Sequence, residues 1–313
     1  MKSAFVFPGQ GSQSIGMLAE LASHHPIVEE TFKQASDVLG YDLWQLTQNG
    51  PESDLNQTDK TQPIMLAAGI AVWRVWQSQS NITPAFLAGH SLGEYTALVA
   101  AEAIDFNDAI ALVELRGKFM QQAVPAGEGA MAAILGLDDA KVLDICRAAS
   151  SAGVVEAVNF NSPGQVVIAG TTIAVNSAIS LATESGAKRA LLLPVSVPSH
   201  CALMKPAAEQ LAERLEKINI QLPSIPVIHN ANVNTASDVV ELKSLLAQQL
   251  FSPVRWVETI ELLSNKGVET LVECGPGKVL AGLNKRIVKS MSAQPVFDTT
   301  SLEKAQQLLG ESE

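Results

Sequence analysis

The pentapeptide Gly89-His90-Ser91-Leu92-Gly93 lies between two runs that predict different secondary structures. Residues 85–88 before it are apolar and predict a short buried strand, whereas residues 94–101 after it are rich in helix formers. Gly-x-Ser-x-Gly between a strand and a helix is typical of the nucleophile elbow, a sharp turn that exposes the serine hydroxyl. The helix N-terminus also favours developing negative charge. We therefore predict that Ser91 is a nucleophile; the alternative is a glycine-rich turn whose serine only caps the helix.

Short apolar runs alternate with helical patterns on both sides of this turn, which indicates a parallel sheet covered by helices. Between residues 126 and 194 the expected order changes to βαββαβ, the order of a ferredoxin-like unit. The sequence thus predicts an α/β-hydrolase-like parallel-sheet domain, residues 1–125 and 195–313, with an inserted ferredoxin-like subdomain at 126–194. The last dozen residues are polar, so we expect them to fray.

Charge and composition exclude several classes of function. The 32 acidic and 21 basic residues give a net charge of −11, which argues against nucleic-acid binding because phosphate neutralisation needs a basic surface. The chain has no run of about 18 uncharged apolar residues, so we expect no membrane span. The N-terminus lacks an apolar signal core, and the three cysteines form no metal-like spacing. These features predict a cytoplasmic protein with reduced thiols and no metal.

A serine nucleophile needs a base, and five histidines are available. These are His24, His25, His90, His200 and His229. His200 lies in the segment between the last expected strand of the inserted unit and the next helix, which would place its imidazole at the domain junction. We favour His200 as the base, with a buried structural histidine as the alternative. No acidic residue between Ser91 and His200 stands out as its orienter, so a backbone carbonyl could orient the ring instead, which weakens an ordinary esterase interpretation.

An oxyanion hole needs two backbone N–H groups aimed at one point. Leu92, which follows the nucleophile, supplies one of them in the elbow geometry. The turn after the first expected strand is a source for the second, because Gly9 and Gly11 flank Gln10 and allow close backbone approach. A phosphate-binding loop is a weaker interpretation of that turn, since it lacks the Lys-Ser/Thr pair of a P-loop.

Arg116 follows Ser91 by 25 residues, inside an apolar helical stretch. A buried arginine needs an anionic partner. That partner could be Glu114 or another acid of the chain, or it could be a substrate carboxylate gripped by the planar guanidinium. The residues alone leave both possibilities open.

Five separated motifs together resemble the malonyl-CoA:acyl carrier protein transacylases of fatty-acid synthesis. They are Phe7-Pro8-Gly9-Gln10-Gly11-Ser12-Gln13, Gly89-His90-Ser91-Leu92-Gly93-Glu94-Tyr95, Arg116-Gly117, Pro198-Ser199-His200 and Glu273-Cys274-Gly275-Pro276-Gly277. The resemblance implies that Ser91 carries the acyl group and that His200 is its base. It further implies oxyanion-hole amides from Gln10 and Leu92, a malonyl-binding Arg116, a His200-orienting carbonyl from Gln249, and an Asn161 that lines the cleft between the domains.

The implied reaction passes a malonyl group from malonyl-CoA to acyl carrier protein, with no metal and no permanently bound cofactor. The carrier is acidic, so docking on this chain would need a local basic patch. Candidate docking residues are Lys188, Arg189, Lys285 and Arg286. We expect a monomer without nucleic-acid or membrane partners. A serine hydrolase, a non-catalytic carrier-binding module, and an acyltransferase of a polyketide or polyunsaturated-lipid pathway remain as alternatives.

Overall fold

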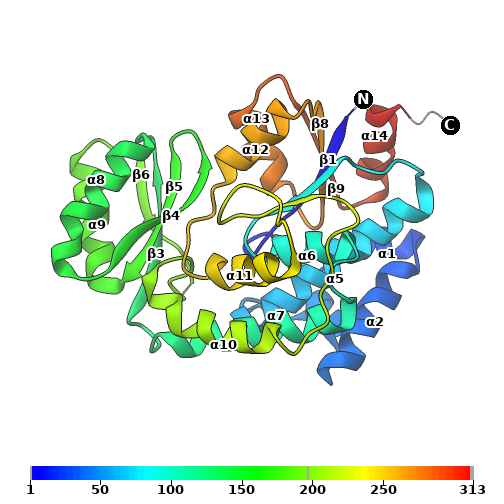
Figure 1. Ribbon diagram of the computed structural model, residues 1–313, viewed down its shortest axis with the longest axis horizontal. Coiled ribbons are helices and arrows are strands. Elements are labelled where there is room, and N and C mark those ends of the chain that lie inside the picture. The colour runs from blue at the N-terminus through cyan, green and yellow to red at the C-terminus, as the bar shows by residue number, and fades with distance from the viewer. Residues whose placement is uncertain (1, 196, 311–313) are drawn as a thin grey trace.

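The computed structural model describes residues 2–195 and 197–310 of the chain. Within these ranges the chain forms a large α/β part and a smaller part to one side of it (Figure 1). Five described strands build the sheet of the large part in the order β7-β2-β1-β8-β9, and all neighbouring pairs are parallel. They are β1 (Ser3–Phe7), β2 (Phe86–Gly89), β7 (Val227–Ile228), β8 (Thr270–Cys274) and β9 (Ser292–Val296).

Pairing of β1 with β2 brings two turns together at the carboxyl edge of this sheet. Phe7, the last residue of β1, is in register with Gly89, the last residue of β2. Because the strands are parallel, the chain leaves both of them at the same edge, where open α/β sheets form their ligand crevices. The turn that contains Gln10 therefore lies beside the turn that contains Ser91.

Helices cover both faces of the parallel sheet (Figure 1). In chain order they are α1 (Ala19–His24), α2 (Ile27–Leu39), α3 (Leu43–Asn49), α4 (Glu52–Leu55), α5 (Thr58–Gln79), α6 (Gly93–Ala100), α7 (Phe106–Ala123), α10 (Lys205–Leu215), α11 (Val239–Gln249), α12 (Trp256–Asn265), α13 (Val279–Ile287) and α14 (Thr299–Leu309). Phe5 and Phe7 of β1 pack on the side of α5, α6 and α7, whereas Ala4 and Val6 pack on the side of α12 and α13. A strand with both faces buried in this way reads as a continuous apolar run. Of the helices described, none is both long and apolar enough for a membrane span.

The smaller part is the predicted ferredoxin-like insertion. Its elements follow the order βαββαβ: β3 (Gly129–Leu135), α8 (Asp139–Ala149), β4 (Val155–Ser162), β5 (Gln165–Thr171), α9 (Thr172–Glu184) and β6 (Arg189–Leu192). The strands pair antiparallel in the order β4-β5-β3-β6, and α8 and α9 cover one face of the sheet. The α/β fold with an inserted ferredoxin-like unit is thereby confirmed; the boundaries at residues 126 and 194 stay a prediction.

Backbone hydrogen bonds join the insertion to the large part. Phe160 of β4 donates its N–H to the carbonyl of Val254 at 3.1 Å, and Val254 donates its own N–H to Val158 at 2.8 Å. The face of the small sheet that lacks helices carries Met131, which packs near the buried Cys201 of the large part. The two parts therefore share a packed, hydrogen-bonded junction.

The expected fraying of the last dozen residues is wrong for those that the structure describes. α14 continues to Leu309, and its start is closed by a capping box. Asp298 accepts the backbone N–H of Ser301 at 2.7 Å, and the Ser301 hydroxyl accepts the N–H of Asp298 at 3.0 Å. Leu302 and Ala305 bury the inner face of the helix. A cap and two buried contacts are enough to order a polar segment, while residues 311–313 lie outside the described ranges.

Replacing Asp298 with alanine tests this account of α14. Loss of an N-cap side chain costs about 1 kcal/mol, so the Asp298→Ala variant should lose about that much free energy of unfolding in a denaturant titration. Glu303→Ala, which removes an exposed acid from the same helix, is the matched control and should leave stability unchanged. Equal stability of the two variants would contradict the capping role.

Candidate active site

The turn after β2 has the close backbone contacts of a nucleophile elbow. A Cβ atom on Gly89 would lie 1.9 Å from the carbonyl of Gly93, and one on Gly93 would lie 2.0 Å from the Phe7 carbonyl oxygen. Ser91 has a φ of 51°, a left-handed conformation that few non-glycine residues adopt. Asn230 braces this turn: its Oδ1 accepts the N–H of Ser91 and its Nδ2 donates to the Gly89 carbonyl, both at 2.7 Å.

Ser91, His200 and Gln249 form a continuous hydrogen-bonded chain. Ser91 Oγ lies 2.7 Å from His200 Nε2, and His200 Nδ1 lies 2.7 Å from the main-chain oxygen of Gln249. Because a carbonyl oxygen only accepts, the imidazole hydrogen belongs on Nδ1. Nε2 is then free to accept the hydroxyl proton, as a general base requires. The structure brings together the three residues that the sequence analysis named for these positions.

The surroundings of His200 keep its imidazole neutral. Its pKa is lowered from 6.5 to about 3, chiefly by burial and then by the nearby Arg116 guanidinium. The hydrogen bond to the Gln249 carbonyl acts against both effects, since it favours the protonated ring. The base is therefore unprotonated across the neutral range.

Arg116 is buried beside Ser91, and its hydrogen-bond partners among the described residues are neutral groups. Its Nη1 donates to Gln62 Oε1 at 2.8 Å, while its Nη2 donates to Gln249 Oε1 at 2.9 Å and to Ser91 Oγ at 3.4 Å. Glu114, the structural alternative, pairs instead with Lys118 at 2.8 Å. Among the described residues, no carboxylate forms a salt bridge with this guanidinium, and its Nε has no hydrogen-bond partner.

These groups open into a cavity of about 120 Å³ at the junction of the two parts. Gln10 and Leu92, the predicted oxyanion-hole residues, both line it, together with Ser91, Arg116 and His200. Its apolar wall comes from both parts of the molecule and comprises Met120, Met131, Leu193, Val195 and Val197. The cavity thus offers a nucleophile, a base, a cation and an apolar wall within one small space.

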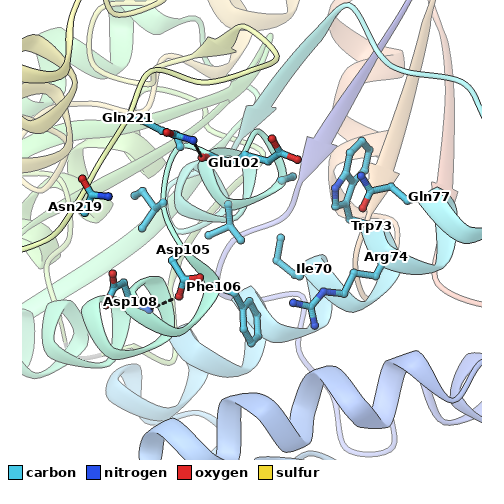
Figure 2. A pocket seen from close by; sticks show the side chains of 14 residues that line it. Ile70, Trp73, Arg74, Gln77, Glu102, Asp105, Phe106, Asp108, Asn219 and Gln221 are labelled. Atoms are coloured by element: carbon cyan, nitrogen blue, oxygen red, sulfur yellow. Dashed lines mark hydrogen bonds between the residues drawn. The ribbon is translucent and has the colours of Figure 1, made fainter.

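A larger hollow on the surface lies between α5, the start of α7 and the segment at residues 219–221 (Figure 2). Its described lining contains no serine, histidine or cysteine. Arg74 at its edge donates to Thr31 and Gln34 and stacks over Phe106. This hollow therefore lacks the chemistry of the smaller cavity.

Asn161 of β4 lies between the insertion and the elbow. Its Oδ1 bonds to His90 Nε2 at 2.8 Å, and the residue is not among those that line the cavity. Asn159 on the same strand lies there instead. Asn161 holds the imidazole of the elbow residue His90, which also packs against Trp256 at a ring distance of 5.6 Å.

Comparison with known proteins agrees with this geometry. A family model described as an acyl transferase domain matches residues 4–309. A malonyl CoA-acyl carrier protein transacylase of Haemophilus influenzae is 58% identical over 309 residues, which cover 98% of this chain and 99% of that protein. The chain belongs to this acyltransferase family. The resemblance predicted from five motifs is thereby confirmed.

Solved structures of acyltransferases share the whole architecture. An acyl carrier protein S-malonyltransferase from Vibrio cholerae has a TM-score of 0.95 at 59% identity, covering 97% of this chain and 100% of that one. A structure of a type II PKS acyl-carrier protein in complex with its malonyl-transacylase gives a TM-score of 0.97 at 55% identity, with 98% and 100% covered.

Three polar residues of this acyltransferase site were missed in the sequence. Gln62 binds Arg116, Asn230 braces the elbow, and Glu94 is a buried carboxylate that accepts hydrogen bonds from Asn230 and Gln249. The available signal was a polar residue in an apolar context: Glu94 lies in the first turn of an otherwise apolar helix, and Asn230 follows an apolar strand by two residues. Neither signal names the partner, because the contacts span more than 130 residues of sequence.

Because the pKa of His200 is lowered, we predict that Ser91 stays reactive well into the acidic pH range. A base whose pKa is about 3 stays unprotonated well below neutral pH, so labelling of Ser91 by a neutral fluorophosphonate should keep its rate down to about pH 5. The rate is read from intact mass against time, with Ser91→Ala as the unlabelled control. A fall centred near pH 6.5 would mean an ordinary histidine pKa and would contradict this environment.

Proposed function

We propose that this chain transfers the malonyl group from malonyl-CoA to the phosphopantetheine thiol of acyl carrier protein, supplying extender units for fatty-acid synthesis. The observation that carries the proposal is Arg116, a buried guanidinium without a carboxylate partner among the described residues, whose Nη2 lies 3.4 Å from Ser91 Oγ. Such a fork binds a carboxylate in two-point fashion. The malonyl acyl group carries that carboxylate close to its thioester carbonyl.

In the first half-reaction, Ser91 Oγ attacks the thioester carbonyl of malonyl-CoA while His200 Nε2 accepts the hydroxyl proton. The carbonyl π electrons move to oxygen, and the backbone N–H groups of Gln10 and Leu92 stabilise this oxyanion. The C–S bond then breaks, and the coenzyme A sulfur leaves with the proton from His200. Malonyl-Ser91 remains, with its carboxylate on Arg116.

The second half-reaction reverses these steps with a different thiol. The phosphopantetheine sulfur of the carrier gives its proton to His200 and attacks the malonyl-Ser91 carbonyl. The ester C–O bond breaks, and Ser91 Oγ recovers the proton from His200. The transfer needs no metal and no permanently bound cofactor, since the charges that develop meet backbone amides and a guanidinium.

A patch of exposed cations is our proposed docking surface for the carrier protein. Lys188 of the insertion and Arg286 of α13 line one surface hollow, and Arg286 Nη1 donates to Gln165 Oε1 of β5 at 3.1 Å. Arg189 and Lys285 are exposed next to them in sequence. On a chain of net charge −11, an acidic carrier gains from such a local patch.

We further propose a monomer that acts in the cytoplasm. The catalytic groups and the cavity walls come from one chain. All three cysteines are free and buried, which fits a reducing compartment. The relative in complex with a type II PKS carrier supports polyketide synthesis as a second setting for the same chemistry.

The central test compares two acyl donors on one nucleophile. Malonyl-CoA should leave a malonyl adduct on the wild-type protein by intact mass, absent in Ser91→Ala. Arg116→Ala should lose at least about 30-fold in kcat/KM for malonyl loading, because truncation of a buried charge pair costs about 2–5 kcal/mol. Acetyl loading, which lacks the carboxylate, should change far less.

Each alternative predicts a different outcome of that experiment. A hydrolase would release malonate faster than it passes the group to a carrier thiol. A non-catalytic binding module would form no adduct at all. Equal losses for malonyl and acetyl in Arg116→Ala would remove the carboxylate-binding role of the guanidinium.

The docking surface is tested by reversing its charge. The double variant Lys285→Glu, Arg286→Glu should raise the KM for carrier protein about tenfold or more at low salt, an energy of about 1.4 kcal/mol. Malonyl-Ser91 formation from malonyl-CoA should keep its wild-type rate. Lys33→Glu, an exposed cation on α2, is the control; a wild-type KM in the double variant would place docking elsewhere.

A further inference from the structure

Glu94 is a buried carboxylate that neither half-reaction uses. It lies three residues after Ser91 in the first turn of α6 and has no solvent exposure. Burial of a charge is costly unless the group is paired or hydrogen-bonded. The partners of Glu94 must therefore offset the cost of burying its charge.

Three described donors point at this carboxylate. His229 Nδ1 lies 2.7 Å from Oε1, while the backbone N–H of Asn230 and Nε2 of Gln249 each lie 2.9 Å from Oε2. A carboxylate suits such a site because it only accepts hydrogen bonds when ionised. An amide of the same shape would turn an N–H toward one of these donors.

Through Gln249, Glu94 holds both the base and the carboxylate-binding group. The side-chain amide of Gln249 has its Oε1 on Arg116 and its Nε2 on Glu94, with a further bond of 3.0 Å to the Ser91 carbonyl. A flipped amide would set its N–H against the Arg116 donor and its oxygen against the Glu94 carboxylate, so the two charges fix its orientation. The main chain of the same residue orients His200.

Through Asn230, Glu94 also holds the nucleophile. The carboxylate fixes the backbone of Asn230, whose side chain bonds to Ser91 N–H and to the Gly89 carbonyl across the strained elbow. Through these two residues, the Glu94 carboxylate helps to position Ser91, His200 and Arg116.

The separation of Glu94 from Arg116 matters as much as its charge. An acid in direct contact would occupy the guanidinium fork that the substrate needs. With one amide between them, the negative charge balances the buried cation. Burial lowers the pKa of Arg116, and Tyr95 and then Glu94 act against that shift. The fork stays open toward the cavity.

We propose that Glu94 is a positioning residue and a buried counter-charge that balances Arg116 without occupying its guanidinium fork, and so limits how tightly the site holds a malonyl carboxylate. This inference rests on the proposed malonyl transfer. Removal of the charge should leave Arg116 uncompensated and thus more attractive to an anion, while the elbow and the base lose their alignment.

The variant Glu94→Gln separates the effect on anion binding from the effect on alignment, because the two acyl donors, malonyl-CoA and acetyl-CoA, respond differently. Its malonyl-CoA KM should fall at least about fivefold, the lower end of couplings between two sites, while the acetyl-CoA KM stays at the wild-type value. Its kcat should fall at least about tenfold for both donors, since alignment of the dyad is common to them. Glu102→Gln, an exposed acid that follows α6, is the matched control and should behave as wild type.

The variant Glu94→Asp keeps the charge but shortens the reach. It should restore the wild-type malonyl KM while kcat stays low, and it carries the test if Glu94→Gln fails to fold. Equal KM changes for malonyl and acetyl in Glu94→Gln, or a wild-type kcat in both variants, would overturn the inference. A wild-type protein without a malonyl-Ser91 adduct would instead overturn the proposed function, and this inference with it.

Discussion

The close approach of two backbones at the carboxyl edge of the parallel sheet is the constraint on which the site depends. The turn after β1 and the turn after β2 touch, and only glycines leave the space: a Cβ on Gly9 would lie 2.5 Å from the His90 carbonyl oxygen, and one on Gly93 would meet the Phe7 carbonyl. This contact brings Gln10 and Leu92 to one cavity with Ser91. The β1–β2 register sets this contact, so the fold and the proposed oxyanion hole have a common origin.

The charged and neutral groups of the site, His200, Arg116 and Glu94, are held in separate positions. His200, the proposed base, is buried and neutral; Arg116 is buried and has no carboxylate partner in the part of the chain that the structure describes; and Glu94 is separated from it by the Gln249 amide. Gln249 separates the two charges and orients the imidazole with one residue. The buried Gln249 amide lies between these two ions and therefore has a single favourable orientation, so its geometry is more tightly constrained than that of a charged group.

Much of this could be predicted from the sequence, and the failures have identifiable causes. The elbow, the βαββαβ insertion and the placement of His200 at the junction depend on local pattern and chain order. The sequence did not identify Asn159 as a cavity residue, because β4 carries register shifts on both sides of it, which break the alternation that tells one face of a strand from the other. Glu94 and Asn230 meet through the pairing of β2 with β7, a contact that no local pattern encodes. α14 was missed because its helical signal consists of a cap and a few apolar residues in a polar segment.

The hydrogen bonds between β4 and Val254 affect how the cavity selects acyl groups by length. They tie the wall supplied by the insertion to the segment that leads into α12 by backbone rather than by side chains. Main-chain bonds do not depend on side-chain rotamers, so we expect this wall to stay at one distance from Ser91 and the cavity to select acyl groups by length without a closing movement.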